Sequence, residues 1–254
     1  MSKKSSPSQH ANKNHLIIYG KHPVFAAIAN PKRQINKILT TTDNANELKA
    51  ACLKAKRTPD IVTTVDRKEI DKLFPTETAH QGFALFCSRL ASYSIEDVIE
   101  MSSKLDKCHV LILDQVTDPQ NIGTIIRSAV AFNTLAIIMQ DKNSPLESGA
   151  MDKAAVGAIE HMPIVRVTNL SRAIEQLKKA DFWSIGMDGY ATTTLDKINK
   201  SGKTAIIMGS EGKGMRRLIE ESCDISVKLQ ISPLTESLNV ATAASIALYE
   251  INKE

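Results

Sequence analysis

Two short apolar runs, Val110–Leu113 and Ala205–Met208, constrain the fold of this chain most. Neither run alternates with polar residues, so we expect both faces of each strand to be buried. Strands of this kind are typical of parallel sheets whose two faces are covered by helices. Amphipathic stretches of helical length separate these and similar runs along the chain. The sequence therefore predicts an α/β fold.

The predicted elements form two sets. In the first set the expected strands are Leu16–Tyr19, Ile35–Thr41, Ile61–Val65 and Gly82–Cys87, and the expected helices are His22–Ala29, Asn44–Arg57 and Arg67–Phe74. In the second set the expected strands are Val110–Val116, Leu135–Gln140, Pro163–Val167, Phe182–Met187, Thr204–Met208 and Ile225–Leu229. Its expected helices are Asn121–Phe132, Ala150–Ile159, Leu170–Ala180, Met215–Ser222 and Leu238–Ile251. We expect a disordered tail at residues 1–14, a small α/β domain at 15–90, a linker at 91–107 with a helix at Ile95–Leu105, and a larger α/β domain at 108–254.

Basic residues are concentrated in the first part of the chain. Residues 1–90 carry 15 Lys and Arg against 7 Asp and Glu, whereas residues 91–254 carry 17 against 21. A basic domain joined to a slightly acidic one favours binding of the first domain to a polyanion such as nucleic acid. A solubilising surface without a ligand explains the same charges, and charge alone leaves both interpretations open.

The composition argues against several classes of protein. No apolar run approaches the roughly 18 residues of a membrane-spanning helix, and the polar segment before Leu16 lacks the apolar core of an export signal. We therefore expect a cytoplasmic protein without a membrane partner. The cysteines lie far apart, at Cys52, Cys87, Cys108 and Cys223, and none belongs to a CxxC pair. This spacing predicts buried apolar side chains and neither a metal site nor a disulfide framework.

The segment Asp114–Arg127 follows the first unbroken apolar run and leads into a helix. Asp118 is placed to cap that helix and Pro119 to occupy its first turn. Such a turn at the carboxyl end of a parallel strand is a place where ligands bind in α/β folds. Arg127 lies among apolar helical residues, so its side chain either reaches solvent or binds an anion.

A second strand-to-helix turn, Gly209–Gly214, follows the run that ends at Met208. Its glycines are spaced G-x-x-G-x-G, which reverses the dinucleotide fingerprint, and Gly214 stands where a P-loop has Ser or Thr. Glycines here let a ligand approach the backbone closely. By itself the segment is also compatible with a simple tight turn.

The third segment, Leu229–Ala241, leads into the last expected helix. Ser237 is placed to cap this helix. Apolar residues then recur with the spacing of one buried helical face, at Val240, Ala244, Ala247, Leu248 and Ile251. Taken alone, this pattern predicts a terminal helix that packs on the sheet.

Together the three segments resemble the three motifs of the SpoU (TrmH) family of RNA methyltransferases, in the same order. The family patterns D-P-x-N-x-G-x-x-x-R, G-x-E-G-x-G and S-L-N-V match Asp118–Arg127, Gly209–Gly214 and Ser237–Val240. The family's K-x-x-x-G-A stretch and the ends of its small RNA-binding domain, which is akin to ribosomal protein L30, are similar to Lys153–Ala158, Tyr19–Val24 and His80–Gly82. The resemblance covers nearly all of the chain after the tail. It is nearest to the RlmB type, which methylates a guanosine ribose in 23S ribosomal RNA.

This resemblance implies a C-terminal SPOUT-type domain, a parallel α/β sheet with a trefoil knot, beside a small L30-like N-terminal α/β domain. It implies that S-adenosyl-L-methionine is the cofactor and that no metal is needed, with cofactor contacts at Gly209, Leu229, Ile231 and Leu238. It implies a homodimer that acts on 23S ribosomal RNA, with catalytic roles for Asn121, Arg127, Glu211 and Asn239. The third family motif commonly begins Ile-Pro-Met, whereas this chain has Leu229-Gln230-Ile231 and lacks the fixed turn of the proline.

The family scheme gives Arg127 the activation of the ribose hydroxyl. Because arginine is not deprotonated in proteins, we expect Arg127 to hold the adjacent phosphate and to stabilise the charge that develops on the 2′-oxygen. We expect Asn121, Glu211 and Asn239 to orient the nucleotide and the arginine. The alanine-rich helix Leu238–Ile251 is expected to supply an apolar contact across the two-fold axis of the dimer.

Three alternatives remain open for the function. A non-catalytic RNA-binding protein of the same fold would not need an intact set of Asn121, Arg127, Glu211 and Asn239. A small-molecule α/β enzyme would be expected to carry a phosphate-binding fingerprint, which this sequence lacks. A methyltransferase that acts on tRNA is the nearest alternative, but such members usually carry terminal helical extensions in place of an L30-like domain.

Overall fold

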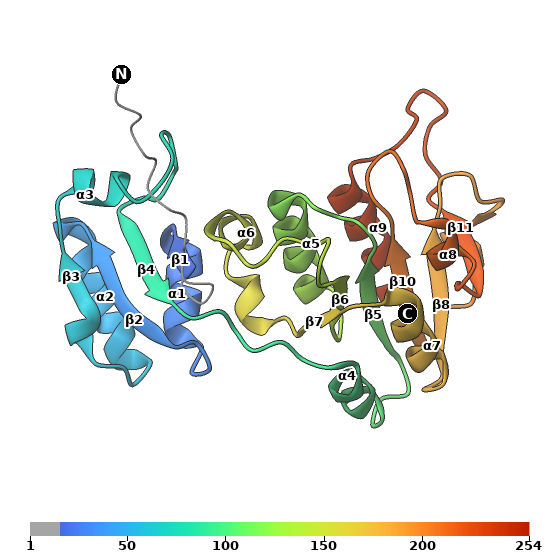
Figure 1. Ribbon diagram of the computed structural model, residues 1–254, viewed down its shortest axis with the longest axis horizontal. Coiled ribbons are helices and arrows are strands. Elements are labelled where there is room, and N and C mark those ends of the chain that lie inside the picture. The colour runs from blue at the N-terminus through green and yellow to red at the C-terminus, as the bar shows by residue number, and fades with distance from the viewer. Residues whose placement is uncertain (1–15, 254) are drawn as a thin grey trace, which may run out of the picture.

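The computed structural model describes residues 16–253, and these residues form two β-sheets that lie side by side along the long axis of the molecule (Figure 1). The N-terminal sheet contains four strands and the C-terminal sheet contains seven. The expected tail, residues 1–14, lies outside the described residues.

The N-terminal sheet is built from the segment that ends at Cys87. Its strands are β1 (Leu16–Tyr19), β2 (Ile35–Thr40), β3 (Val62–Thr64) and β4 (Phe83–Cys87), and its helical segments are α1 (Lys21–Ala29), α2 (Thr42–Lys54), the 3-10 turn η1 (Pro59–Ile61) and α3 (Arg67–Asp71). The strand order is β1-β4-β2-β3, with β4 antiparallel to both neighbours and β3 parallel to β2. Helix α4 (Ile95–Ser102) lies in the connection to the second sheet and begins with a capping box between Ser94 and Asp97.

The C-terminal sheet is parallel throughout its strand pairs. Its strands are β5 (Cys108–Leu113), β6 (Ile137–Gln140), β7 (Ile164–Val167), β8 (Phe182–Met187), β9 (Thr193–Thr194), β10 (Lys203–Met208) and β11 (Ile225–Lys228). Its helical segments are α5 (Pro119–Ala131), α6 (Gly149–Ala155), η2 (Ala158–His161), α7 (Leu170–Lys178), η3 (Leu195–Lys197), α8 (Arg217–Glu220) and α9 (Val240–Asn252). The strand order is β7-β6-β5-β10-β8-β11-β9, and the predicted α/β class with a parallel sheet is confirmed.

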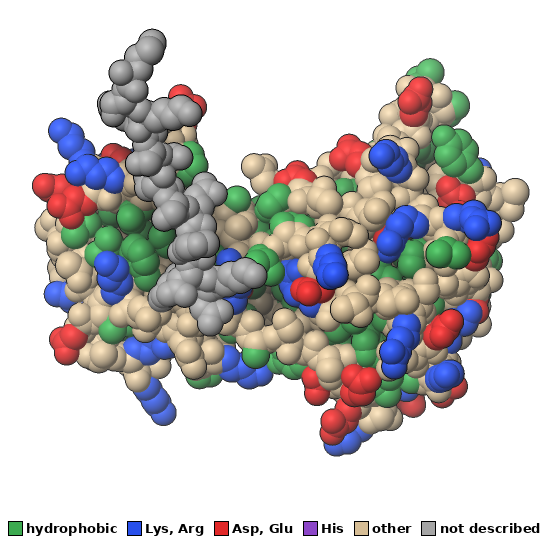
Figure 2. Space-filling model, viewed as in Figure 1, with side chains coloured by type: hydrophobic (Ala, Val, Ile, Leu, Met, Phe, Trp, Pro, Cys, Tyr) green, Lys and Arg blue, Asp and Glu red, His purple; other side chains and the backbone are tan. Residues whose placement is uncertain are grey.

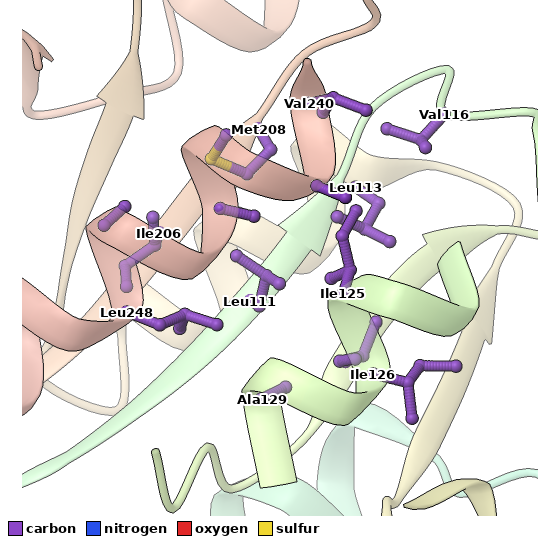
Figure 3. Close-up of a cluster of buried hydrophobic side chains, with 14 of the residues drawn as sticks. Leu111, Leu113, Val116, Ile125, Ile126, Ala129, Ile206, Met208, Val240 and Leu248 are labelled. Carbon is purple, nitrogen blue, oxygen red and sulfur yellow. The ribbon is translucent and has the colours of Figure 1, made fainter. Parts of the chain in front are cut away.

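Helices cover both faces of the parallel sheet because its central strands are apolar on both sides. Leu111 and Leu113 of β5 belong to an apolar cluster with α5, α6 and α9, whereas Val110 and Ile112 belong to a cluster with α4 and α7. Figure 3 shows Leu111 and Leu113 between α5 and α9, close to Ile206 of β10. The unbroken apolar runs in the sequence therefore correspond to strands buried on both faces, as predicted.

The predicted helix Ala150–Ile159 is wrong in its second half. Helix α6 ends at Ala155, and Val156 and Gly157 have positive φ angles of 54° and 88°. The chain turns here where it packs on α1, since a Cβ on Gly157 would lie 2.5 Å from the Cβ of Ala26. Helical periodicity could not reveal this break, because its cause is a contact with the N-terminal domain.

The last helix also differs from its prediction at the N-terminus. Asn239, and not Ser237, caps α9, and its side-chain oxygen accepts hydrogen bonds from the backbone amides of Ala241 and Thr242. Both candidates are of residue types that commonly cap helices. The residue nearer to the apolar stripe is the one that is used.

The apolar stripe of α9 is buried as predicted, but its alanines face the interior of the same chain. Ala241, Ala244 and Ala247 belong to the cluster that contains β5 and α5. These three alanines are therefore not available for a contact between two subunits, and the contact expected from this helix stays a prediction for its outward face. The outward face of α9 instead carries Ile246 and Tyr249, which are 42% and 53% exposed.

The strand order creates a switch point between the neighbouring strands β5 and β10. After β5 the chain enters α5, which packs on one face of the sheet, and after β10 it enters α8, whose Ile219 packs on the opposite face. Neighbouring parallel strands whose following segments diverge leave a crevice at their carboxyl ends, where ligands bind in open α/β sheets. The first two predicted segments begin at this crevice.

A buried ion cluster joins the two domains. Arg33, in the turn before β2, has a buried side chain that donates to Glu160 at 2.7 and 3.0 Å and to Glu147 at 2.6 Å. Asn30 also donates to Glu160, at 2.7 Å. Burial, and then the charge of Glu147, raise the pKa of the neighbouring Asp152 carboxyl well above its usual value. Because these groups come from both domains, the cluster fixes one domain against the other.

His109 of β5 leads to a prediction about acid stability. Its side chain is buried, and burial, followed by the charge of Lys107, lowers its pKa to about 4. Since the unfolded histidine titrates near pH 6.5, the unfolded chain binds more protons than the folded chain between roughly pH 6.5 and pH 4. The folded state is therefore expected to lose on the order of 2 kcal/mol of stability as the pH falls through this window.

We expect this acid-dependent loss to be smaller by that amount in His109→Gln. Urea unfolding of both proteins at about pH 7 and about pH 4.5 measures the difference. Comparing the pH dependence, and not the stability at one pH, removes the effect of the substitution on packing. The same pH dependence in both proteins would contradict the prediction.

Candidate functional site

The connection between β5 and α5 carries the first predicted segment. Asp118 caps α5 by accepting a hydrogen bond from the amide of Gln120 at 2.9 Å, and Pro119 occupies the first turn. Both of these sequence assignments are confirmed. Strand β5 ends at Leu113 and not at Val116, because Gln115 adopts a left-handed backbone with a φ of 59°. This turn puts Asn121 in the first turn of α5, at the carboxyl edge of the sheet.

Two of the predicted site residues meet at this edge. Nδ2 of Asn239 donates to Oδ1 of Asn121 at 3.0 Å, which ties the N-terminus of α9 to the first turn of α5. The oxygen of the same Asn239 side chain caps α9, so both ends of its amide are used. Within residues 16–253 the Nδ2 of Asn121 has no hydrogen-bond partner. That donor is therefore available to a ligand.

The turn after β10 is closed by its own backbone. Ser210 and Gly214 exchange two backbone hydrogen bonds of 3.0 Å, and Gly209 is buried next to them. A Cβ on Gly209 would overlap the carbonyl group of Gly214 and the amide nitrogen of Met215. Because no side chain fits at this position, glycine is required for the turn to close on itself.

A buried carboxylate connects the two turns. Asp114 accepts hydrogen bonds from the backbone amide of Arg216 at 2.9 Å and from its Nε at 2.8 Å, and the Nη2 lies 2.7 Å away. The pair fixes the residues before α8 against the end of β5. The sequence does not predict this contact, because the two residues are remote along the chain and neither belongs to a family motif.

A cavity of about 670 Å³ lies at the carboxyl ends of β6, β5 and β10. The residues that line it from these three turns include Gln115, Thr117, Lys142, Ser144, Glu211 and Lys213. Glu211 belongs to a motif visible in the sequence, whereas Lys142 and Ser144 were not predicted, since the turn after β6 matches no motif. A larger cavity of about 950 Å³ lies at the domain junction near Arg89 and Glu160, and none of the predicted site residues lines it. The smaller cavity is therefore the better candidate, because Glu211 is the one predicted site residue that lines either cavity.

The residues expected to contact the cofactor come from two segments. Gly209 is buried, Leu229 and Leu238 are half-buried, and Ile231 is 37% exposed. Leu229 and Ile231 follow β11, which is separated from β10 by β8 in the sheet. Leu229 and Ile231 therefore follow the carboxyl end of a strand two positions from β10, on the side away from β5, whereas Leu238 precedes Asn239, which contacts the first turn of α5.

Arg127 stands apart from the other predicted catalytic residues. Its side chain is exposed on α5, and in the described part of the chain no hydrogen bond or ion pair holds it. It does not line the cavity beside β5 and β10. The sequence allowed the Arg127 side chain either to reach solvent or to bind an anion. In the single chain it reaches solvent.

Neither a metal cluster nor a membrane-spanning segment was found among residues 16–253. No three His, Cys, Asp or Glu side chains are grouped so that they could hold a metal ion there. No helix in the same range combines the length and the apolar character needed to cross a membrane.

Basic side chains are not gathered into one patch on the face seen in Figure 2. On that face Lys and Arg are spread over both domains and are intermixed with Asp and Glu (Figure 2). The charge difference between the two parts of the sequence therefore does not by itself define a nucleic-acid surface on this face.

Two family models match the chain. The SpoU rRNA Methylase family matches residues 109–249, which include the seven-stranded sheet except for Cys108 at the start of β5. A model described as RNA 2′-O ribose methyltransferase substrate binding matches residues 17–93, which include nearly all of the four-stranded sheet.

Curated relatives match over most of the chain. The 23S rRNA (guanosine-2′-O-)-methyltransferase RlmB of Coxiella burnetii is 34% identical, over 93% of this chain and 95% of that protein. An uncharacterized tRNA/rRNA methyltransferase of Synechocystis is 33% identical over 94% of this chain. The chain spans 62% of the length of the Synechocystis protein.

Solved structures share the fold. The SpoU methyltransferase AviRb from Streptomyces viridochromogenes, in complex with AdoMet, has a TM-score of 0.78 at 21% identity, over 94% of this chain and 89% of that chain. The A. aeolicus TrmH/SpoU tRNA modifying enzyme has a TM-score of 0.52 at 21% identity, over 62% of this chain and 80% of that chain. At such identities the likeness shows the fold alone.

Proposed function

This chain belongs to the SpoU rRNA methylase family, and on that premise we propose that it transfers a methyl group from S-adenosyl-L-methionine to the ribose 2′-oxygen of a guanosine in 23S ribosomal RNA. The observation that carries the proposal is the hydrogen bond between Asn121 and Asn239. These residues belong to the first and third family motifs, and their contact lies at the same sheet edge as the Gly209 turn.

The relative from Coxiella burnetii supports ribosomal RNA as the substrate, because it is named for a guanosine of 23S rRNA and aligns with this chain almost from end to end. The family model that matches residues 17–93 is described as RNA 2′-O ribose methyltransferase substrate binding, which supports RNA as the substrate.

The residues expected to contact the cofactor suit it chemically. Gly209 allows the turn after β10 to close, and Leu229, Ile231 and Leu238 offer apolar contacts for adenosine. When bound, S-adenosylmethionine supplies a methyl group on a positively charged sulfur that is already a good leaving group. The chain itself must hold the ribose and manage the charge and proton of its 2′-hydroxyl.

The predicted catalytic residues divide this work. The free Nδ2 of Asn121 donates to the nucleotide, while Asn239 keeps Asn121 in place. The exposed carboxylate of Glu211 accepts from a ribose hydroxyl at the cavity. Arg127 holds the adjacent phosphate and stabilises the negative charge that grows on the 2′-oxygen. The phosphate or water accepts the proton.

We further propose a homodimer formed through the outer faces of α5 and α9. Ile246 and Tyr249 are exposed there, and Tyr249 packs edge-on against Phe132, next to the end of α5. Arg127 is exposed on the same helix α5, so a partner at this face would meet its guanidinium. The trefoil knot, the domain limits 15–90, 91–107 and 108–254, and a cytoplasmic location remain parts of the proposal.

Calorimetry with S-adenosylmethionine tests the cofactor assignment. We expect saturable heat that a chelator does not reduce, and loss of that heat in Gly209→Val, because a side chain there would overlap the turn. Gly202→Asn is the matched control, since Gly202 lies in open space at the other end of β10 and Asn tolerates its left-handed φ of 82°. No heat for the wild type with the cofactor or its demethylated product, even with RNA present, would reject the assignment.

Mapping of ribose methylation identifies the substrate. In a strain that lacks the protein, we expect one guanosine of 23S rRNA to lose its 2′-O-methyl group and to regain it on complementation. Loss of a mark in tRNA would favour the tRNA alternative. No change in either RNA, for a protein that binds RNA, would favour the non-catalytic alternative.

A further inference from the structure

The turns on the two sides of β5 place two lysines at one cavity. Lys142 comes from the turn after β6 and Lys213 from the turn after β10, and β5 lies between these strands. Both side chains are exposed, and within residues 16–253 neither forms an ion pair or a side-chain hydrogen bond. Glu211 is the one acidic residue among those that line the cavity. The lining is therefore net positive.

The turn after β6, which forms one wall of this cavity, contains a buried hydroxyl group without a hydrogen-bond partner. Ser144 is 8% exposed, and its Oγ has no hydrogen-bond partner in the described part of the chain. An unpaired buried hydroxyl destabilises the free protein. Because the Oγ atom is buried in the free protein, an oxygen atom of a ligand in the cavity would satisfy it once the side chain rotates toward the cavity.

Arginines hold residues 144–147, the segment that begins at this wall, in place. Arg166 donates to the carbonyl of Ser144 at 3.5 Å and to that of the following proline. Arg89 donates to the carbonyl of Glu147 at 3.2 Å, and Arg33 pairs with the carboxylate of Glu147 at 2.6 Å. Because the wall is fixed in advance, little ordering of its backbone is required when a ligand binds.

We propose that Lys142 and Lys213 bind phosphodiester groups of the RNA strand on the two sides of the target nucleotide, and that Ser144 donates to one of these phosphates. The inference rests on the proposed function, because it states how the substrate is positioned in that site. Lysine suits this role, since its ammonium group pairs with phosphate as a point charge and reads no base. The carboxylate of the cofactor is another anion that two lysines would attract, and the experiment separates the two.

The experiment compares Lys142→Ala, Lys213→Ala and the double variant with Lys179→Ala. Lys179 is exposed at the end of α7, at the opposite edge of the same sheet, and its side chain has no ion pair within residues 16–253. Methyl transfer from labelled S-adenosylmethionine is measured on 23S rRNA from a strain that lacks the protein. We expect the double variant to raise KM for RNA about tenfold while kcat changes less than about twofold, because phosphate contacts position the strand.

Salt dependence and cofactor affinity complete the test. The slope of log K for RNA against log salt is expected to become shallower by roughly 0.7 for each lysine removed. The dissociation constant of S-adenosylmethionine should stay unchanged, and Lys142→Arg and Lys213→Arg should retain the wild-type slope. An unchanged KM and slope in the double variant would overturn the proposal, as would a weaker affinity for the cofactor.

Ser144→Ala gives a readout that a merely structural residue would not show. Removal of the unpaired hydroxyl is expected to raise the Tm of the RNA-free protein and to raise KM for RNA at the same time. A lower Tm with an unchanged KM would reject the role of Ser144. If the wild-type protein transfers no methyl group to this RNA, the proposed function itself is rejected. That outcome is distinct from an active enzyme whose KM for RNA does not depend on Lys142 and Lys213.

Discussion

Arg33→Met is expected to lower the free energy of unfolding by about 3–5 kcal/mol, the usual effect of breaking a buried ion pair. The guanidinium is buried and donates to Glu160, Glu147 and the carbonyl of Ser88. Burial alone would lower the pKa of Arg33, yet its pKa lies above the usual value because the two carboxylates stabilise the cation. Methionine preserves much of the volume and leaves the carboxylates buried without their partner.

A matched control is available at the surface. Arg217 is 82% exposed and pairs with Glu221 at 3.3 Å, one turn along the chain, so Arg217→Met makes the same chemical change where solvent screens it. Urea unfolding should show a loss of less than about 1 kcal/mol there. The double variant Arg33→Met/Glu160→Met should recover part of the loss, since removing both partners leaves fewer unpaired charges. Equal losses in Arg33→Met and Arg217→Met would contradict the role of the cluster.

The same cluster changes the interpretation of domain deletions. On sequence grounds alone, removing residues 1–90 should abolish RNA methylation and leave cofactor binding intact. The truncated chain would lack Arg33 while keeping Glu147, Asp152 and Glu160. We therefore expect it to be less stable, and its loss of activity would not by itself identify the N-terminal domain as the substrate module.

Strand and helix types followed from the sequence because apolar periodicity reports burial. The strand Phe182–Met187 is predicted and observed with the same bounds, and so is Leu16–Tyr19. The errors occur where a tertiary contact determines whether an element forms or where it ends. Helix α6 stops at Ala155 because Gly157 packs on α1, and the short strand β9 (Thr193–Thr194) exists through its pairing with β11. A single-sequence pattern contains no information about such partners.

The residues of the candidate site likewise fall into those that the sequence predicts and those that only the fold reveals. Asn121, Glu211 and Asn239 belong to patterns that the sequence displays, whereas Asp114 and Arg216 are joined by a fold that brings remote turns together. The sequence does not predict a role for Ser144, because the burial and the missing hydrogen-bond partner of its hydroxyl group are visible only in the folded chain. Arg127 shows the converse case, since its motif predicts catalysis and the single chain leaves it in solvent.

Arg127→Ala is expected to lower kcat by about 100-fold or more, the usual effect of removing a group that stabilises developing charge. Folding and the affinity for S-adenosylmethionine should change little, because the side chain is exposed and makes no hydrogen bond or ion pair within residues 16–253. Arg127→Lys should restore little activity, since a point charge lacks the planar fork of arginine. Arg172→Ala, at an exposed position of α7, is the control and should keep full activity. A kcat for Arg127→Ala within about tenfold of the wild type would remove Arg127 from the mechanism.

The solvent-exposed position of Arg127 in one chain raises the question of which chain it serves. If the guanidinium reaches the cofactor site of the partner subunit, then mixing Arg127→Ala with Gly209→Val should restore activity, because each mixed dimer would combine an intact arginine with an intact Gly209 turn. After full subunit exchange about half of the dimers are mixed and each contains one complete site, so about a quarter of the wild-type activity is expected. Exchange is verified first with differently tagged chains. Activity that stays at the level of the separate variants would indicate a site built within one chain, in which α5 or the RNA must move to bring Arg127 to the ribose. A strictly monomeric wild-type protein with full activity would rule out the dimer, and the exposed Ile246 and Tyr249 would then need another explanation.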